Sequence, residues 1–356
     1  MKRTLALLMA IVMVLALCAC GNTEVPADAS KTDSPVADAP ADTTVYDFIF
    51  AHCEADDAST HDIVADAIVE YLNENAPGRF NCKVYPAAQL GADRENIESV
   101  QSGTITMTGQ STPVQVSFVP SLCIFDAPFA YRTLDDCEAL LADENLMNLV
   151  NGEFEKVGLK QGLWVVGGYR HLTTNKEIKE ISDIKGLKIR TMENKYHMKL
   201  FECLGATATP INSSELFTAL QQGTVDGQEN DYGVIVMKDI QSVQKYLTET
   251  HHLVAFNSYI CNLDWYNNLP TDLQKVFDEA LAYAKEKGDS YTYENQEYYR
   301  QVIADAGVQM SAFTAEQIAE MKDMCAPVYE MIANADGMNM DVYNAFNAAL
   351  ENIYSK

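Results

Sequence analysis

Two arginines and one polar run stand out because each follows an apolar segment typical of a buried strand. Arg190 ends the segment Leu187–Arg190, and Arg170 follows Trp164–Tyr169, which includes two glycines. The run 228–230 reads Gln-Glu-Asn and also follows a predicted return to the sheet. The planar fork of arginine can bind a carboxylate through two parallel hydrogen bonds, a geometry that lysine cannot match. We therefore expect these residues to contribute to a carboxylate-binding site at strand ends.

Two more polar residues lie at a strand end and a helix start, where ligands bind in open α/β sheets. His52 ends the strand predicted from Val45, and Asp93 begins an acidic helix. Each could instead be a capping or packing residue, and the sequence leaves both interpretations open.

The sequence offers little support for enzymatic, metal or disulfide chemistry. It contains no GxSxG, HExxH or P-loop motif, and its histidines have no obvious nucleophile partner. Of the nine cysteines, seven follow Cys20, an odd number without CxxC spacing, and we interpret them as small buried apolar residues. We expect no catalytic residue, no metal and no cofactor.

The overall charge limits the possible partners. The 356 residues include 25 basic and 51 acidic ones, a net charge of −26. Binding to nucleic acid is disfavoured because phosphate contacts need clustered lysine and arginine. An acidic surface also repels anionic ligands, so an anion site must depend on a few local cations.

The start of the chain has the features of a bacterial lipoprotein signal. Lys2 and Arg3 precede an unbroken apolar run, Leu5–Leu17, which is too short to span a bilayer as a helix. The run ends in Leu-Cys-Ala-Cys-Gly, which resembles a lipobox. We expect Cys20 to carry the lipid, with Cys18 as the weaker choice.

Residues 1–19 would then be a signal peptide, and residues 20–44 a lipidated cysteine followed by a disordered tether rich in Ala, Asp, Pro, Ser and Thr. A lipid anchor and a tether predict a globular part held outside the cytoplasm at the cell membrane. An uncleaved N-terminal anchor is the alternative.

The rest of the chain alternates short β-rich runs with amphipathic helices, which favours an α/β fold with a mostly parallel sheet. Helices are predicted at 59–75, 134–150, 194–204, 315–333 and 341–354, and a buried irregular loop at 119–129. Asn212 and Glu215 have the spacing of a capping box. A helix from Pro270 to Asp305 would be roughly 35 residues and ~50 Å long.

Several segments, in order and with fitting spacing, resemble the DctP family of solute-binding proteins of TRAP transporters. They are VYPAAQLGADRENIESVQSG, FDAPFAYRTLDD, GYRHLTTN, GLKIR, ATPINSSELFTALQQGTVDGQEN, SVQKYLTETHH and WYNNLPTDLQKVFDEAL. The resemblance runs from about Val45 to the C-terminus. It implies a periplasmic-binding-protein fold, with two α/β lobes joined by hinge strands and a long helix spanning both. We expect lobe I at 45–167 and 256–295, and lobe II at 168–255 and 296–356, including the C-terminal helices.

The resemblance also implies roles for matching residues. Arg190 is similar to the family's central arginine, which forms a salt bridge with the ligand carboxylate. Arg170 is similar to a second arginine near that carboxylate, and Asn230 to the amide that completes its coordination. For both arginines, an ion pair within the protein is the alternative. Gln228 and Glu229 are expected to brace the turn and the cleft wall.

Four positions bear on the identity of the ligand. Ser213 stands where many members have an aromatic residue, so the pocket could be roomier or more polar. Glu193 and Ser111 differ from the residues of sialic-acid binders, which favours a smaller sugar acid, such as a uronate or aldonate, or a C4-dicarboxylate. His252 matches a position that can line the cleft.

The implied function is the capture of an organic acid between two closing lobes and its delivery to a TRAP membrane permease. We expect a monomer with no nucleic-acid partner. A ligand-binding module of an extracytoplasmic sensor is the alternative that the sequence leaves open.

Overall fold

The structure is a computed structural model that describes residues 43–55 and 59–355. The predicted signal peptide, Cys20 and nearly all of the predicted tether lie outside these residues. Within them, no helix combines the length and apolar character needed to cross a membrane.

In the described part of the chain, one mixed sheet of nine strands has the order β2-β1-β3-β8-β4-β7-β5-β6, with β9 pairing β8. The strands are β1 Tyr46–Ala51, β2 Phe80–Tyr85, β3 Met107–Ser111, β4 Leu159–Thr174, β5 Lys188–Thr191, β6 Thr207–Pro210, β7 Gly227–Asn230, β8 Tyr246–Asn262 and β9 Gln309–Ala312. Pairing is parallel within β2-β1-β3 and β7-β5-β6, and antiparallel where β3, β8, β4 and β7 meet. The prediction of a parallel sheet thus holds for the two outer parts and fails at the centre.

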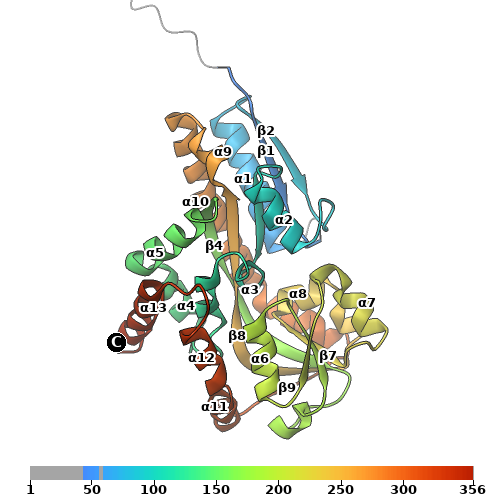
Figure 1. Cartoon of the computed structure of the whole chain (residues 1–356). Helices are drawn as coiled ribbons and strands as arrows, with labels where there is room; N and C mark the ends of the chain where they lie inside the picture. Colours follow the sequence, from blue (N-terminus) through green and yellow to red (C-terminus); the bar gives the residue numbers. More distant parts are fainter. Residues whose placement is uncertain (1–42, 56–58, 356) are drawn as a thin grey trace, which may run out of the picture. The chain divides into compact units, whose positions relative to one another are not determined.

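The two long strands β4 and β8 connect these outer parts and run together through the fold (Figure 1). Where β4 begins, its partner β8 also pairs with β3, through residues 257–261 of β8. Further along the chain, β4 pairs with β7 through residues 171–174. Register shifts at Val166/Gly168 and Arg170/Leu172 interrupt the ladder, and such bulges bend a strand pair. These strands join the two lobes of a periplasmic-binding-protein fold.

Helices pack on both parts of the sheet. The α-helices are α1 Thr60–Asn75, α2 Asp93–Gln101, α3 Thr112–Gln115, α4 Leu134–Leu141, α5 Glu144–Glu155, α6 Lys195–Cys203, α7 Leu216–Gln221, α8 Tyr232–Met237, α9 Leu263–Asn267, α10 Thr271–Asp305, α11 Ala315–Met324, α12 Ala326–Ala333 and α13 Met340–Tyr354. Short 3-10 helices are η1 Pro120–Asp126, η2 Ile181–Ile184, η3 Ser213–Glu215 and η4 Ile240–Ser242. Ser59 and Asn194 cap α1 and α6 with their side chains, which fixes both starts as the sequence predicts.

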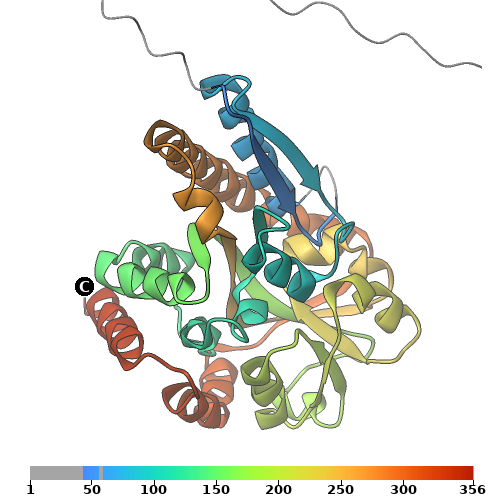
Figure 2. The ribbon, with the colours of Figure 1, turned by 45° about the horizontal axis from the view of Figure 1, so that its top comes forward.

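The long helix α10 has 35 residues and the predicted bounds. It packs along α1 in one lobe, crosses β4 and packs on α8 in the other (Figure 2). Gly168 permits this crossing, because its φ of +114° suits glycine and a Cβ there would lie 2.9 Å from the amide of Gln296 in α10. The predicted helix that spans both lobes is confirmed.

Five local predictions differ from the structure. The helix expected at 134–150 is two helices, because Asp143 caps the start of α5. The loop expected at 119–129 contains η1, and the helix expected at 315–333 is broken between α11 and α12. Asn212 makes no capping hydrogen bond, since a 3-10 turn replaces the expected helix start. Finally, α13 packs on α4, α5 and η1, which were assigned to lobe I.

Candidate functional site

Arg190 is the buried cation around which the candidate site is built. It lies in β5 with 2% of its surface exposed, and its Nε donates to the backbone oxygen of Ile211 at 2.8 Å. In the described part of the chain its Nη2 has no hydrogen-bond partner. Burial lowers the pKa of Arg190 to about 10, so the group stays charged at neutral pH. A buried charge with an unused donor favours the binding of an anion.

Arg190 faces a cavity that holds about 360 Å³ of space not filled by protein atoms, its mouth included. The lining residues are Glu54, His61, Asp93, Gln110, Ser111, Val114, Arg190, Met192, Ser213, Asn230 and Val234. These residues lie at or just beyond the ends of the strands β1, β3, β5 and β7, or within the helices α1, α2, α3, η3 and α8. The parallel strands thus direct their carboxyl ends to one place, as open α/β sheets do at ligand sites.

A second chamber adjoins this cavity. It holds about 460 Å³ and shares Glu54, His61, Ser111 and Val234 with the first. These volumes include open space at the mouths; the part that the centre of a water-sized sphere can reach is about 30 Å³ in the first chamber and about 40 Å³ in the second, so both are narrow. The shared residues place the two chambers side by side, with Arg190 in the lining of the first.

Asn230 presents a fixed amide to the same cavity. Its Oδ1 accepts a hydrogen bond from Arg170 Nη2 at 2.7 Å, and its Nδ2 donates to Gln228 Oε1 at 2.6 Å. Because an amide nitrogen carries two hydrogens, one donor remains for a ligand. The neighbours of Asn230 therefore orient this donor beside Arg190.

Arg170 does not line the cavity, in contrast to its expected place beside the ligand. It is 1% exposed, and its Nε and Nη2 lie 2.5 and 2.9 Å from the two carboxylate oxygens of Glu229. Burial alone would raise the pKa of Glu229, but the charge of Arg170, His197 Nδ1 at 3.7 Å and a hydrogen bond with His252 Nε2 at 3.2 Å hold it well below its usual range. The pair forms a buried layer behind Asn230.

The wall opposite Arg190 is acidic. Glu54 lies 3.2 Å from Lys238 Nζ and accepts a hydrogen bond from Ser213 Oγ at 3.5 Å, so it links the end of β1 to the other lobe. Burial and the charge of Glu54 raise the pKa of Asp93 to about 6. Burial lowers the pKa of His61 to about 4, so its imidazole is neutral at neutral pH.

The structure brings four predicted residues together and places four elsewhere. Arg190, Asn230, Asp93 and Ser213 line the cavity. Arg170, His52 and His252 are buried outside its lining, with His52 3.4 Å from Asp62 and His252 3.2 Å from Glu229. Glu193 is a surface residue, 66% exposed, that meets Arg94 at 3.7 Å, so its expected place in the pocket is wrong.

Sequence reasoning missed three polar residues of the cavity wall. Glu54 follows β1, His61 lies in the first turn of α1, and Gln110 lies near the end of β3. The rule that pointed to His52 would have found Glu54, because it lies two residues further along the same strand end. Nothing in the sequence singles out Gln110.

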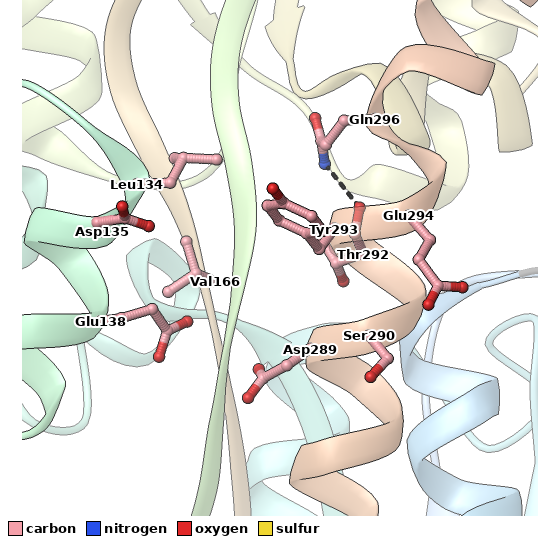
Figure 3. A pocket seen from close by; sticks show the side chains of 10 residues that line it. All are labelled: Leu134, Asp135, Glu138, Val166, Asp289, Ser290, Thr292, Tyr293, Glu294 and Gln296. Atoms are coloured by element: carbon pink, nitrogen blue, oxygen red, sulfur yellow. Dashed lines mark hydrogen bonds between the residues drawn. The ribbon is translucent and has the colours of Figure 1, made fainter.

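A larger hollow on the other side of β4 has the wrong chemistry for an acid. Figure 3 shows that it lies between α4 and α10, with acidic side chains on both walls. Asp135 and Glu138 come from α4, and Asp289 and Glu294 from α10. Lys285, which lies nearby, already pairs with Glu138 and Asp289. An anion therefore has no free cation among the described residues that line this hollow.

Comparisons with known proteins point to one family. The family model described as bacterial extracellular solute-binding protein, family 7 (DctP), matches residues 50–336. A solute-binding protein of Verminephrobacter eiseniae is 37% identical over 219 residues, which are 61% of this chain and 65% of that protein, just under two thirds of its length.

Two solved structures have a very similar fold. A TRAP periplasmic solute-binding protein of Desulfovibrio salexigens with bound orotic acid is 27% identical, with a TM-score of 0.81, over 86% of this chain and 99% of that one. The sugar acid binding protein DctPAm of Advenella mimigardefordensis, in complex with galactonate, is 26% identical, with a TM-score of 0.82, over 87% of this chain and 99% of that one. The likeness thus extends across both lobes.

Proposed function

Because this chain belongs to family 7 of the bacterial extracellular solute-binding proteins, we propose that it captures an organic acid outside the cytoplasm and delivers it to a TRAP-type membrane permease. The ligand is a sugar acid, such as a uronate or aldonate, or a C4-dicarboxylate. Galactonate and orotic acid, the ligands of the two similar structures, are both carboxylic acids. Binding, rather than chemistry on the ligand, is the whole task of the site.

The unused Nη2 of Arg190 is the observation that supports this proposal most strongly. A ligand carboxylate accepts hydrogen bonds from this nitrogen and from the second amide hydrogen of Asn230. Arg170 acts one layer further back, since it holds the oxygen of Asn230 and is itself held by Glu229. The carboxylate clamp is therefore Arg190 and Asn230, with Arg170 as a positioning residue.

Capture involves closure of the lobes around the acid. The interrupted register of β4 and β8 supplies bending points, and Glu54 meets Lys238 and Ser213 across the cavity. A ligand favours the closed arrangement when it makes better contacts there than in the open one. The permease then recognises the closed form.

The anchor to the membrane is a separate part of the proposal. Cys20 carries the lipid, and the monomeric globular part works at the outer face of the cell membrane. A Cys20→Ala chain should appear in the soluble fraction on cell fractionation while the parent chain stays with the membrane. If both chains appear in the same fraction, the proposal that Cys20 carries a lipid is refuted.

The proposed carboxylate anchor can be tested by binding measurements. A thermal-shift screen against uronates, aldonates, keto acids and C4-dicarboxylates should identify acids that raise the melting temperature by mass action. Calorimetry with a stabilising acid should then show that Arg190→Ala weakens binding by about 2–5 kcal/mol, because a buried charged pair is lost. Arg132→Ala, which removes an exposed arginine outside the cavity, is the matched control. Normal binding by Arg190→Ala would refute the proposed anchor.

A further inference from the structure

The cavity can neutralise only one carboxylate. Among the described residues that line its two chambers, Arg190 is the only arginine or lysine, whereas Glu54, Asp93 and Asp231 are acidic. Lys238 lies beside the cavity but is already paired with Glu54 at 3.2 Å. Once Arg190 has bound a carboxylate, a second one has acidic neighbours and no cation left to pair with.

The two acids of lobe I also define what the far end of a ligand must offer. Ionised carboxylates accept hydrogen bonds but cannot donate them, so Glu54 and Asp93 need donors on the ligand. The neighbouring Gln110 and Ser111 are neutral, but their donors are used within the protein: Gln110 Nε2 donates to the backbone oxygen of Asp93 and to Thr108 Oγ1, and Ser111 Oγ donates to Asn257 Oδ1. Towards a ligand both can therefore only accept hydrogen bonds. This wall suits a chain of hydroxyl groups and disfavours a second anion.

We propose that Glu54 and Asp93 select a monocarboxylic acid with hydroxyl groups at its far end and exclude the corresponding dicarboxylic acid. This inference rests on the proposed function, because it assumes that Arg190 holds the first carboxylate. Of the two ligand classes named there, it chooses the sugar acid over the dicarboxylate. A hydroxyl is preferred to an ammonium group because Lys238 already neutralises Glu54 and Arg190 lies in the same chamber.

A matched pair of ligands isolates the second charge. Galactarate differs from galactonate only in that the terminal CH₂OH is a carboxylate. At pH 8, calorimetry on the purified protein should give at least about tenfold tighter binding of galactonate, because the second carboxylate of galactarate meets like charges and no free cation. Gluconate with glucarate and threonate with tartrate repeat the comparison at the same and a shorter length. Hexanoate and 6-aminohexanoate test for a requirement for hydroxyl or ammonium groups.

Two isosteric variants assign the discrimination to named residues. Glu54→Gln and Asp93→Asn each remove one charge at nearly constant size, and each should reduce the ratio of dicarboxylate to monocarboxylate dissociation constants by about tenfold. Asp135→Asn removes an equivalent charge in the hollow between α4 and α10 and should leave the ratio unchanged. Arg190→Ala should weaken both members of each pair.

The outcomes separate this inference from the function on which it rests. If dicarboxylates bind as tightly as their partners, if they alone bind, or if neither isosteric variant changes the ratio, the selection by Glu54 and Asp93 is refuted while the carboxylate anchor stands. Tighter binding of 6-aminohexanoate than of galactonate would also refute it, in favour of an ammonium group. If Arg190→Ala binds every acid normally, the proposed function itself fails.

Discussion

The regions around Arg170 and Arg190 use the same side chain for opposite purposes. Arg190 pairs with Gln228 of β7, Arg170 precedes a residue of β4 that pairs with Asn230 of β7, and the two arginines are 2% and 1% exposed. Arg170 uses its nitrogens within the protein, on Glu229 and Asn230. Arg190 makes a backbone hydrogen bond and keeps Nη2 unused beside a cavity. The difference teaches that the partner of a buried arginine, rather than its burial, indicates whether it binds a ligand.

The largest expected effect is on stability, and it concerns Arg170, which the comparison assigns to the interior of the protein. Arg170→Met should lower the free energy of unfolding by about 3–5 kcal/mol, because it leaves the charge of Glu229 buried without its main partner. Urea denaturation without ligand measures this loss.

The matched double variant serves as its control. Arg170→Met with Glu229→Gln removes both charges and should recover a large part of the lost stability. If the single variant is as stable as the parent protein, the ion pair does not hold this region together.

Arg190→Met should have a different effect on stability. In the absence of ligand we expect its free energy of unfolding to lie within about 1 kcal/mol of the parent value or above it, because a buried and partly unsatisfied charge is replaced by an apolar side chain. Acid binding should be lost in the same variant. A stability loss as large as that of Arg170→Met would show that Arg190, like Arg170, mainly stabilises the fold.

The smallest effect concerns the acid that faces Arg190. The folded pKa of Asp93, about 6, lies above its usual value of 3.8. The folded state therefore binds more protons between these values, and stability falls as pH rises through this window. The charges that act on Asp93 are Glu54, Lys238 and Arg190, with Cys53 as a hydrogen-bond partner.

Asp93→Asn removes this titration. At pH 8 the variant should be more stable than the parent by about 1 kcal/mol, a modest figure because the side chain is partly exposed. The advantage should shrink as the pH is lowered towards 4. Melting curves of both proteins across this range measure it, and a difference that does not change with pH would rule out titration of Asp93 as the cause.

The sequence was informative where local rules and the sheet's geometry agree. Arg190, Asn230 and Asp93 line one cavity because carboxyl ends of parallel strands and the helices after them meet at one edge. The role of Arg170 was ambiguous, because its partner Glu229 lies 59 residues away and only the pairing of β4 with β7 brings them together. An ion pair was the alternative left open for Arg170, and the structure favours it.

Other errors arose where tertiary structure overrides a local pattern. Asn212 has the spacing of a capping box, but the chain turns there into a 3-10 helix, and Ser213 instead reaches Glu54 of the other lobe. Glu193 follows the arginine strand closely in sequence, yet it points to the surface beside Arg94. Neither direction follows from sequence spacing alone.

The continuous sheet has a consequence for how this chain folds. Met107 of β3 pairs with Cys261 of β8, and Leu159 of β4 pairs with Asn262, so the first lobe is incomplete until most of the chain is available. Contacts so distant in sequence slow folding, because the entropy cost of closing a long loop comes before the stabilising contacts form. If the chain were expressed as two fragments divided at the glycines of β4, each fragment would therefore have open sheet edges and a tendency to aggregate. Neither fragment would be a folded, functional lobe.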